Sequence, residues 1–256
     1  MWLKIIPFGT LVVDVASMFN GLSHGRVASY YAPDERNEIR IALNALLVVA
    51  GDRVVLIDPG CADFLPARIR DEYRLHLPVP LNRILDGSGY SDNEVTDVVF
   101  THLHFDHGSG AFRRVRGGLE KRFPKARYHV SRAHYEYALD PDPAEADSMF
   151  ARFLKHAEPL HWLEDWKEPW MEFRYAQGHT RHMAVPVIHT PGSDTWFLTD
   201  LMPMAPFLER DVNSGYDLDP DLARREKVRF LDECSRAAEL ILFHEPEEAK
   251  VFYPCL

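Results

Sequence analysis

The sequence has little cysteine and no long apolar segment. Its three cysteines, Cys61, Cys234 and Cys255, lie far apart and form no CxxC pair. An odd number of widely spaced cysteines is typical of free thiols in a reducing compartment and argues against a disulfide framework. No apolar run is long enough to cross a bilayer, and the first residues lack the charged start and cleavage site of a signal peptide. We therefore expect a cytoplasmic protein with no membrane partner.

Positive charge is also scarce in this chain. The 256 residues include 29 Lys and Arg against 39 Asp and Glu, which gives a formal net charge of -10. A surface of this sign repels a phosphate backbone, so we do not expect nucleic acid as a partner. The hydrophobic fraction of 46% is that of an ordinary globular protein. Because no internal repeat or shift in composition marks a boundary, we expect residues 1–256 to form a single domain.

Potential metal ligands are concentrated in the segment Thr-His-Leu-His-Phe-Asp-His-Gly-Ser-Gly, residues 101–110. Four metal-binding side chains lie within six residues of it: His102, His104, Asp106 and His107. The preceding apolar run, residues 96–100, predicts a buried strand, and Gly108 and Gly110 predict a tight turn into a following helix. Imidazoles and a carboxylate gathered at a strand end predict a metal site, for which zinc, iron and manganese are suitable ions.

Three later positions supply further donors. His179 follows a predicted strand in Gly-His-Thr, Asp200 ends an apolar strand, and His244 ends another. One metal ion takes about four or more ligands, so the 102–107 segment needs partners from elsewhere in the chain. Each of the three positions is a weak signal alone, but their shared location at strand ends makes the combined set a strong one.

Hydrophobic periodicity and turn residues predict the secondary structure. Apolar runs predict two short strands within 3–16, joined at residues 8–10, and further strands at 41–50, 54–58, 96–100, 126–130, 171–175, 185–189, 196–199, 240–243 and 251–253. Helices are predicted at 63–76, 81–86, 131–139, 144–155 and 219–238. Irregular segments are expected at 19–40 and 202–218. This order predicts two halves packed sheet on sheet, with helices outside.

The pattern His-x-His-x-Asp-His, then Gly-His-Thr, a strand-end Asp and a late strand-end His resembles the metallo-β-lactamase superfamily. The resemblance covers nearly the whole chain, from residue 54 through Glu245. Residues 101–110 are especially similar to the branch that contains the N-acyl-homoserine lactonases. The resemblance implies an α+β fold, a four-layer αββα sandwich, with a two-metal centre at one edge of the sheets.

The resemblance also implies a role for each candidate ligand. The first divalent metal ion would be held by His102, His104 and His179. The second would be held by Asp106, His107 and His244. Asp200 would bridge the two ions, and Asp106 would also act as a catalytic residue that receives a proton. Zinc is the expected metal, with iron or manganese as alternatives.

Two segments depart from the family pattern. Residues 178–183 are Gly-His-Thr-Arg-His-Met where the family often has Gly-His-Thr-Pro-Gly-His, which leaves the role of His182 open. No tyrosine directly follows Asp200, although the lactonases place a substrate-contacting tyrosine there, and Tyr216 is a candidate replacement. Asp58, at the end of the 54–58 strand, has two interpretations: it orients a ligand imidazole, or it caps a turn.

The implied activity is hydrolysis of a lactone, carboxylic ester or thioester, in which a metal-bound hydroxide attacks the carbonyl of a small-molecule substrate. The alternative is phosphodiesterase or phosphotriesterase chemistry on the same centre. A redox enzyme with iron in the same ligand set is a third class: the flavo-diiron type is disfavoured because the chain has no appended flavin domain, and the persulfide-oxidising type stays open. The complete ligand set argues against a vestigial binding protein. The oligomeric state is left open, with a homodimer as one option.

Overall fold

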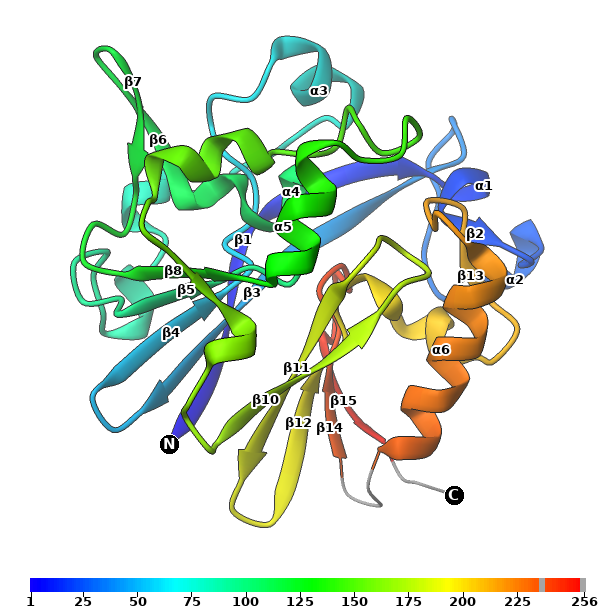
Figure 1. Ribbon diagram of the computed structural model, residues 1–256. Coiled ribbons are helices and arrows are strands. Elements are labelled where there is room, and N and C mark those ends of the chain that lie inside the picture. The colour runs from blue at the N-terminus through cyan, green and yellow to red at the C-terminus, as the bar shows by residue number, and fades with distance from the viewer. Residues whose placement is uncertain (235–237, 254–256) are drawn as a thin grey trace. The chain divides into compact units, whose positions relative to one another are not determined.

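The structure is a computed structural model that describes residues 1–234 and 238–253. The chain forms two compact units, the first made of Met1–Gly9 and Leu43–Lys167 and the second of Thr10–Ala42 and Glu168–Leu256. Each unit combines one large sheet with helices (Figure 1). The predicted α+β class is therefore confirmed, while the single domain predicted for residues 1–256 stays a prediction.

The large sheet of the first unit has six strands in the order β1-β3-β4-β5-β8-β9. Their bounds are β1 (Trp2–Asp14), β3 (Glu38–Ala50), β4 (Arg53–Ile57), β5 (Asp97–Val99), β8 (Arg127–Val130) and β9 (Leu160–Trp162). β3 and β4 form the predicted antiparallel hairpin, whereas β4, β5, β8 and β9 pair in parallel. Parallel strands end at the same edge of a sheet, so the segments that follow β4, β5 and β8 meet there.

Short helices and one hairpin complete the first unit. They are α3 (Ala67–Glu72), η1 (Leu81–Arg83), η2 (Asp86–Ser88), α4 (Phe105–Gly108), η3 (Ser109–Ala111), α5 (Arg132–Leu139), η4 (Ala151–His156), η5 (Leu163–Asp165) and the strands β6 (Phe112–Val115) and β7 (Gly118–Lys121). As predicted, Ser131 caps the 132–139 helix, because its side chain accepts a hydrogen bond from the main chain of His134.

The sheet of the second unit has five strands in the order β10-β11-β12-β14-β15. They are β10 (Met171–Ala176), β11 (Met183–Thr190), β12 (Ser193–Phe197), β14 (Ala238–Ile241) and β15 (Lys250–Tyr253). β12 and β14 pair in parallel, and β10 runs in the same direction as β12 because each is antiparallel to β11. The segments after β10, β12 and β14 therefore leave this sheet at one edge, and these are the segments that contain His179, Asp200 and His244.

Helices and a small sheet surround the strands of the second unit. They are α1 (Val15–Met18), α2 (His24–Val27), η6 (Thr199–Leu201), η7 (Ala205–Leu208), α6 (Pro220–Glu233) and the paired strands β2 (Phe19–Asn20) and β13 (Asn213–Ser214). The Asp219 side chain caps α6 by accepting a hydrogen bond from Leu222 N, with Pro220 at the first helical position as predicted. α6 packs its Phe230 ring edge-on against Trp196 of β12.

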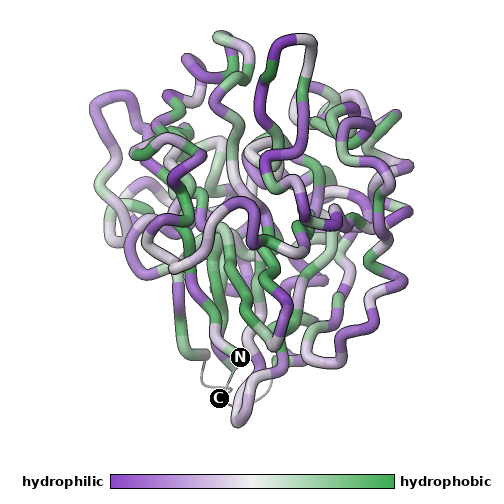
Figure 2. Tube along the Cα trace, turned by 90° about the vertical axis from the view of Figure 1, so that its left-hand side faces the viewer, coloured by the Kyte–Doolittle hydropathy of each residue, from purple (hydrophilic) through white to green (hydrophobic). Residues whose placement is uncertain are grey.

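Apolar residues are concentrated in the strands, while many connecting segments are hydrophilic (Figure 2). β3 shows this most clearly, because every side chain from Ile41 to Val49 is buried. A strand that is apolar on both faces fits the continuous hydrophobic run in the sequence. In the part of the chain that the structure describes, no helix has the length and apolarity needed to cross a membrane.

Several predicted elements differ from those observed. Residues 2–14 form one strand instead of two, because Gly9 does not turn the chain but gives room for the main chain of His76, whose oxygen would lie 2.7 Å from an added Cβ. The helix predicted at 219–238 ends at Glu233, and residues 235–237 lie outside the described residues. The hairpin of β6 and β7 and the short strand β9 were not predicted.

The helix predicted at 144–155 is replaced by turns and the 3₁₀ helix η4. Here main-chain hydrogen bonds across the fold override the local helical pattern. Phe105 N–H donates to Ser148 O, Phe150 N–H donates to Leu103 O, and His104 forms an isolated bridge with Met149. Residues 148–150 therefore lie alongside the histidine-rich loop and fix its course.

The two glycines after that loop serve close packing and not the predicted tight turn. The helix α4 already begins at Phe105, and neither glycine adopts a positive φ. A Cβ on Gly108 would lie 2.5 Å from the Phe100 ring, and one on Gly110 would lie 2.1 Å from Pro59 O. These contacts bring the end of the loop against the turn after β4.

We expect Gly110→Ala to lower the free energy of unfolding by about 1–3 kcal/mol or more, because the added methyl group overlaps a main-chain carbonyl. Gly87→Ala is the matched control, since no atom lies within 4 Å of a Cβ built there. Chemical denaturation of both variants measures the difference. Equal stability of the two variants would show that the 108–111 segment shifts at little cost.

Candidate functional site

The segment after β5 buries three imidazoles side by side. His102 and His107 are fully buried, and His104 is nearly so. His102 Nε2 lies 3.1 Å from His104 Nδ1, and the His102 and His107 ring centroids are 4.0 Å apart. Asp106, in the same segment, is half-buried. Three buried imidazoles at this spacing cannot all be protonated without strong repulsion, whereas neutral imidazoles are suitable metal ligands.

Asp58, directly after β4, holds this histidine segment in place. Its carboxylate accepts hydrogen bonds from Thr101 N at 2.8 Å and from Thr101 Oγ1 at 2.5 Å. The same carboxylate lies 2.9 Å from His107 Nδ1, so the Nδ1 proton is fixed and Nε2 is the nitrogen that could bind a metal ion. Of the two interpretations of Asp58, this contact supports the orientation of a ligand imidazole. Burial raises the pKa of Asp58, and the hydrogen bonds from His107 and Thr101 oppose that rise.

Two residues near these histidines were missed by the sequence analysis. His134 is fully buried in α5, and its Nε2 accepts a hydrogen bond from Leu103 N at 2.8 Å. Glu145 is buried with its Oε1 3.8 Å from His104 Nε2 and its Oε2 bound by the Tyr137 hydroxyl at 2.6 Å. Neither residue lies in a motif, so only the packing of α5 and the following turn against the loop reveals them.

In the second unit, Asp200 lies between two imidazoles. Asp200 Oδ2 is 3.1 Å from His179 Nε2, and Asp200 Oδ1 is 3.3 Å from His244 Nε2. All three side chains are buried. The structure therefore brings together the three candidate residues that the sequence places farthest apart, and each carboxylate oxygen faces a different ring.

The other nitrogen of each of these imidazoles is also held. His179 Nδ1 lies 3.1 Å from Asp217 Oδ1, and His244 Nδ1 donates to the main-chain oxygen of Ala42 at 2.8 Å. Burial lowers the pKa of His179, but the carboxylates of Asp200 and Asp217 outweigh it and raise the pKa to about 10. A site with this electrostatic character strongly favours a positive charge. Asp217, in the Asn-Ser-Gly-Tyr-Asp segment, was not predicted to act here.

The turn that contains His179 is stabilised by residues of its own unit. The Glu226 carboxylate accepts hydrogen bonds from Gln177 N and Gly178 N, both at 2.9 Å. His182 has a positive φ of 60°, and its N–H donates to Gln177 Oε1 at 2.9 Å. His182 thus closes the shortened Gly-His-Thr turn, which indicates a structural role. Tyr216 is 42% exposed, and its main-chain N–H donates to Ser214 Oγ at 3.1 Å.

The middle of the chain matches the family model described as the metallo-beta-lactamase superfamily, over residues 41–203. The chain belongs to the metallo-β-lactamase superfamily. The predicted resemblance and fold are thereby confirmed. The chain is a metal-dependent hydrolase, as predicted.

Solved structures with the metallo-β-lactamase fold are similar over almost the whole chain. A probable metal-dependent hydrolase from Staphylococcus aureus is 18% identical with a TM-score of 0.88, over 99% of this chain and 92% of its own. The dizinc quorum-quenching lactonase AidC is 21% identical with a TM-score of 0.80, over 99% of this chain and 90% of AidC. The hydrolase AbOPH is 22% identical with a TM-score of 0.78, over 99% of this chain and 90% of AbOPH. A comparison with curated proteins finds no significant match.

The donors present suit the metal ions of a metallo-β-lactamase. Each unit offers imidazole nitrogens together with a carboxylate, and no cysteine lies among the predicted ligands. Zinc, iron and manganese all accept this combination of nitrogen and oxygen ligands. The buried acceptors at Asp58 and Asp217 supply the outer hydrogen bonds that metal-binding histidines usually make. The residues therefore fit divalent metal ions.

We expect Asp217→Asn to weaken metal binding by about 10–100-fold, because it removes the charge that faces His179 Nδ1. Competition with a chromophoric chelator measures the affinity, and circular dichroism checks the fold. Asp211→Asn, an exposed carboxylate nearby in the same unit, is the matched control. Wild-type affinity in Asp217→Asn would mean that the contact with His179 only supports the local loop.

Proposed function

We propose that this chain is a dinuclear metal-dependent hydrolase that cleaves a lactone, a carboxylic ester or a thioester. In this proposal the first ion is held by His102, His104 and His179. The second ion is held by Asp106, His107 and His244, and Asp200 bridges the two. Zinc is the proposed metal, because the lactonase AidC is described as a dizinc enzyme and the donor set is compatible with zinc.

The observation that carries the proposal is the position of Asp200. Its two oxygens lie 3.1 and 3.3 Å from the Nε2 atoms of His179 and His244. Because the two oxygens face different imidazoles, each oxygen can ligate a different ion, which supports a ligand shared by two ions.

Two divalent ions, when bound, lower the pKa of water to near neutrality and polarise the substrate carbonyl. The chain's own contribution is to position ligands and to move a proton. Asp58 and Asp217 hold the far nitrogens of His107 and His179, so the ligand nitrogens keep one orientation. Asp106 is the least buried of the proposed ligands, which makes it the carboxylate best placed to exchange a proton with solvent or a leaving group.

A lactone is the first substrate class to test. AidC is described as a lactonase in complex with a product, N-hexanoyl-L-homoserine, and other similar structures are described as N-acyl-homoserine lactone lactonases. These neighbours share the fold with this chain at low identity, so they guide the choice of substrate without deciding it. Phosphodiesters and phosphotriesters are the alternative class, since the same kind of centre could attack phosphorus.

We expect the purified protein to contain about two metal ions per chain, in keeping with two-metal hydrolytic sites. Elemental analysis gives this number, and assays with lactones, esters, thioesters, phosphodiesters and phosphotriesters, with and without chelator, identify the substrate class. A chelator-sensitive rate confined to phosphorus substrates would replace the carbonyl hydrolase by the alternative. One ion or none at saturating metal would contradict the dinuclear centre.

We expect His104→Ala to lower kcat/KM by more than about 100-fold and Asp200→Ala to lose metal, because ligand loss exceeds the usual effect of an outer hydrogen bond. His76→Ala, which removes an exposed imidazole, is the control and should keep wild-type metal content. Full metal content and rate in Asp200→Ala would contradict the bridging assignment.

A further inference from the structure

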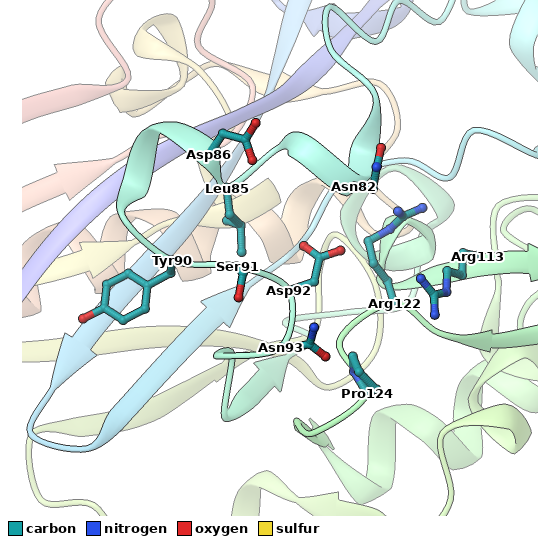
Figure 3. A pocket seen from close by; sticks show the side chains of 10 residues that line it. All are labelled: Asn82, Leu85, Asp86, Tyr90, Ser91, Asp92, Asn93, Arg113, Arg122 and Pro124. Carbon is teal, nitrogen blue, oxygen red and sulfur yellow. The ribbon is translucent and has the colours of Figure 1, made fainter.

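A polar pocket in the first unit shares no residue with the proposed metal ligands. It has a volume of about 240 Å³, which is smaller than the roughly 300–1,000 Å³ of sites for drug-sized ligands. Residues 82–93, the β6 strand and the segment after β7 supply its lining (Figure 3). The pocket therefore suits a small, polar molecule.

Arg122 is the unusual residue in this pocket. It is only 3% exposed, yet its guanidinium binds neutral groups, with Nε donating to Gly110 O at 2.8 Å and Nη2 to Phe112 O at 3.2 Å. Among the residues that the structure describes, no carboxylate forms an ion pair with it. A buried arginine is normally paired with an acid, because an uncompensated charge inside a protein is costly. Burial lowers the pKa of Arg122, while the carboxylates of Asp63 and Asp92, which form no ion pair with it, oppose that decrease.

Asp92, which also lines the pocket, is a carboxylate without a charged partner among the described residues. It is half-buried, and within the described part of the chain it forms no hydrogen bond or ion pair. Burial raises the pKa of Asp92, while Arg122 and Arg113 oppose that rise from a distance. Figure 3 shows the Asp92 carboxylate beside Arg122, with Arg113 on the far side of Arg122. The pocket thus presents both signs of charge without a direct pair between Asp92 and either arginine.

The two other charged side chains of the pocket lining are already paired. Arg113 Nε binds Glu120 Oε1 at 2.7 Å, and Asp86 is paired with Arg83 at 2.8 Å. This leaves Arg122 and Asp92 as the two groups that a ligand would satisfy. The Asp92 carboxylate would repel a simple anion, and the guanidinium groups would repel a simple cation. Neither kind of ion alone therefore matches the charges of the pocket.

We propose that this pocket binds a small zwitterionic amino acid, with its carboxylate on Arg122 and its ammonium group on Asp92. Both contacts are charge-assisted hydrogen bonds, which are the stronger kind. The amide of Asn82 and the hydroxyl of Ser91, also in the lining, add neutral donors and acceptors for the ligand's remaining polar atoms. The inference is independent of the hydrolase activity, because its residues lie outside the proposed ligand set.

Isothermal titration calorimetry of the purified protein, with its bound metal, tests the pocket. L-Serine is the probe. Acetate carries only the carboxylate and methylammonium only the ammonium group, so these two ions serve as half-probes. We expect saturable one-to-one binding of L-serine, and binding of each half-probe at least about tenfold weaker, because each loses one charge-assisted contact. Absence of saturable L-serine binding would overturn the proposal. Acetate that binds as tightly as L-serine would also overturn it and would indicate an anion site.

Variants of the pocket separate the two contacts. Asp92→Asn should weaken L-serine binding at least about tenfold while leaving acetate binding equal or stronger, since the opposing charge is gone. Arg122→Lys should weaken L-serine and acetate binding alike, because it keeps the positive charge but loses the forked donors, and circular dichroism checks the fold. Asp52→Asn and Arg116→Gln remove exposed charges outside the lining and should bind as wild type. Unchanged L-serine binding in Asp92→Asn would refute the proposed ammonium contact.

Discussion

Three of the buried candidate ligands have one imidazole nitrogen held by a fixed acceptor, and the orientation of their rings depends on this constraint. Asp58 holds His107, Asp217 holds His179, and the main-chain oxygen of Ala42 holds His244. A neutral imidazole can carry its proton on either nitrogen, and only one of the two forms points a lone pair at a metal ion. The acceptors therefore decide which atom can bind metal, before any metal is present.

Close main-chain packing also holds the segments that carry the candidate ligands. Gly110 and Gly178 each sit where an added Cβ would lie about 2 Å from main-chain atoms, of Pro59 and Ala223 respectively. Main-chain hydrogen bonds between residues 148–150 and the 103–105 segment fix the histidine loop from its other side. A loop held in this way keeps its candidate ligands in one geometry.

The sequence predicted what is local and missed what depends on tertiary contacts. Residues 102–107, Asp200 and His244 were predicted as ligands because short motifs or strand ends mark them, and most strands were predicted correctly because they are continuous apolar runs. His134, Glu145 and Asp217 approach the histidines only through the folding of distant segments, so no pattern in the chain identifies them. The 144–155 segment has a helical pattern, yet main-chain pairing with the loop gives it a different structure.

Asp200 offers one oxygen to each of two imidazoles, and this has a consequence for how metal is taken up. If one carboxylate ligates both ions, the first ion to arrive fixes its rotamer and prepares half of the second position. The binding of the two ions is then coupled through this side chain. Exchange of one ion for another element would likewise disturb its neighbour through this single side chain, so mixed-metal forms would not behave as the average of the two pure ones.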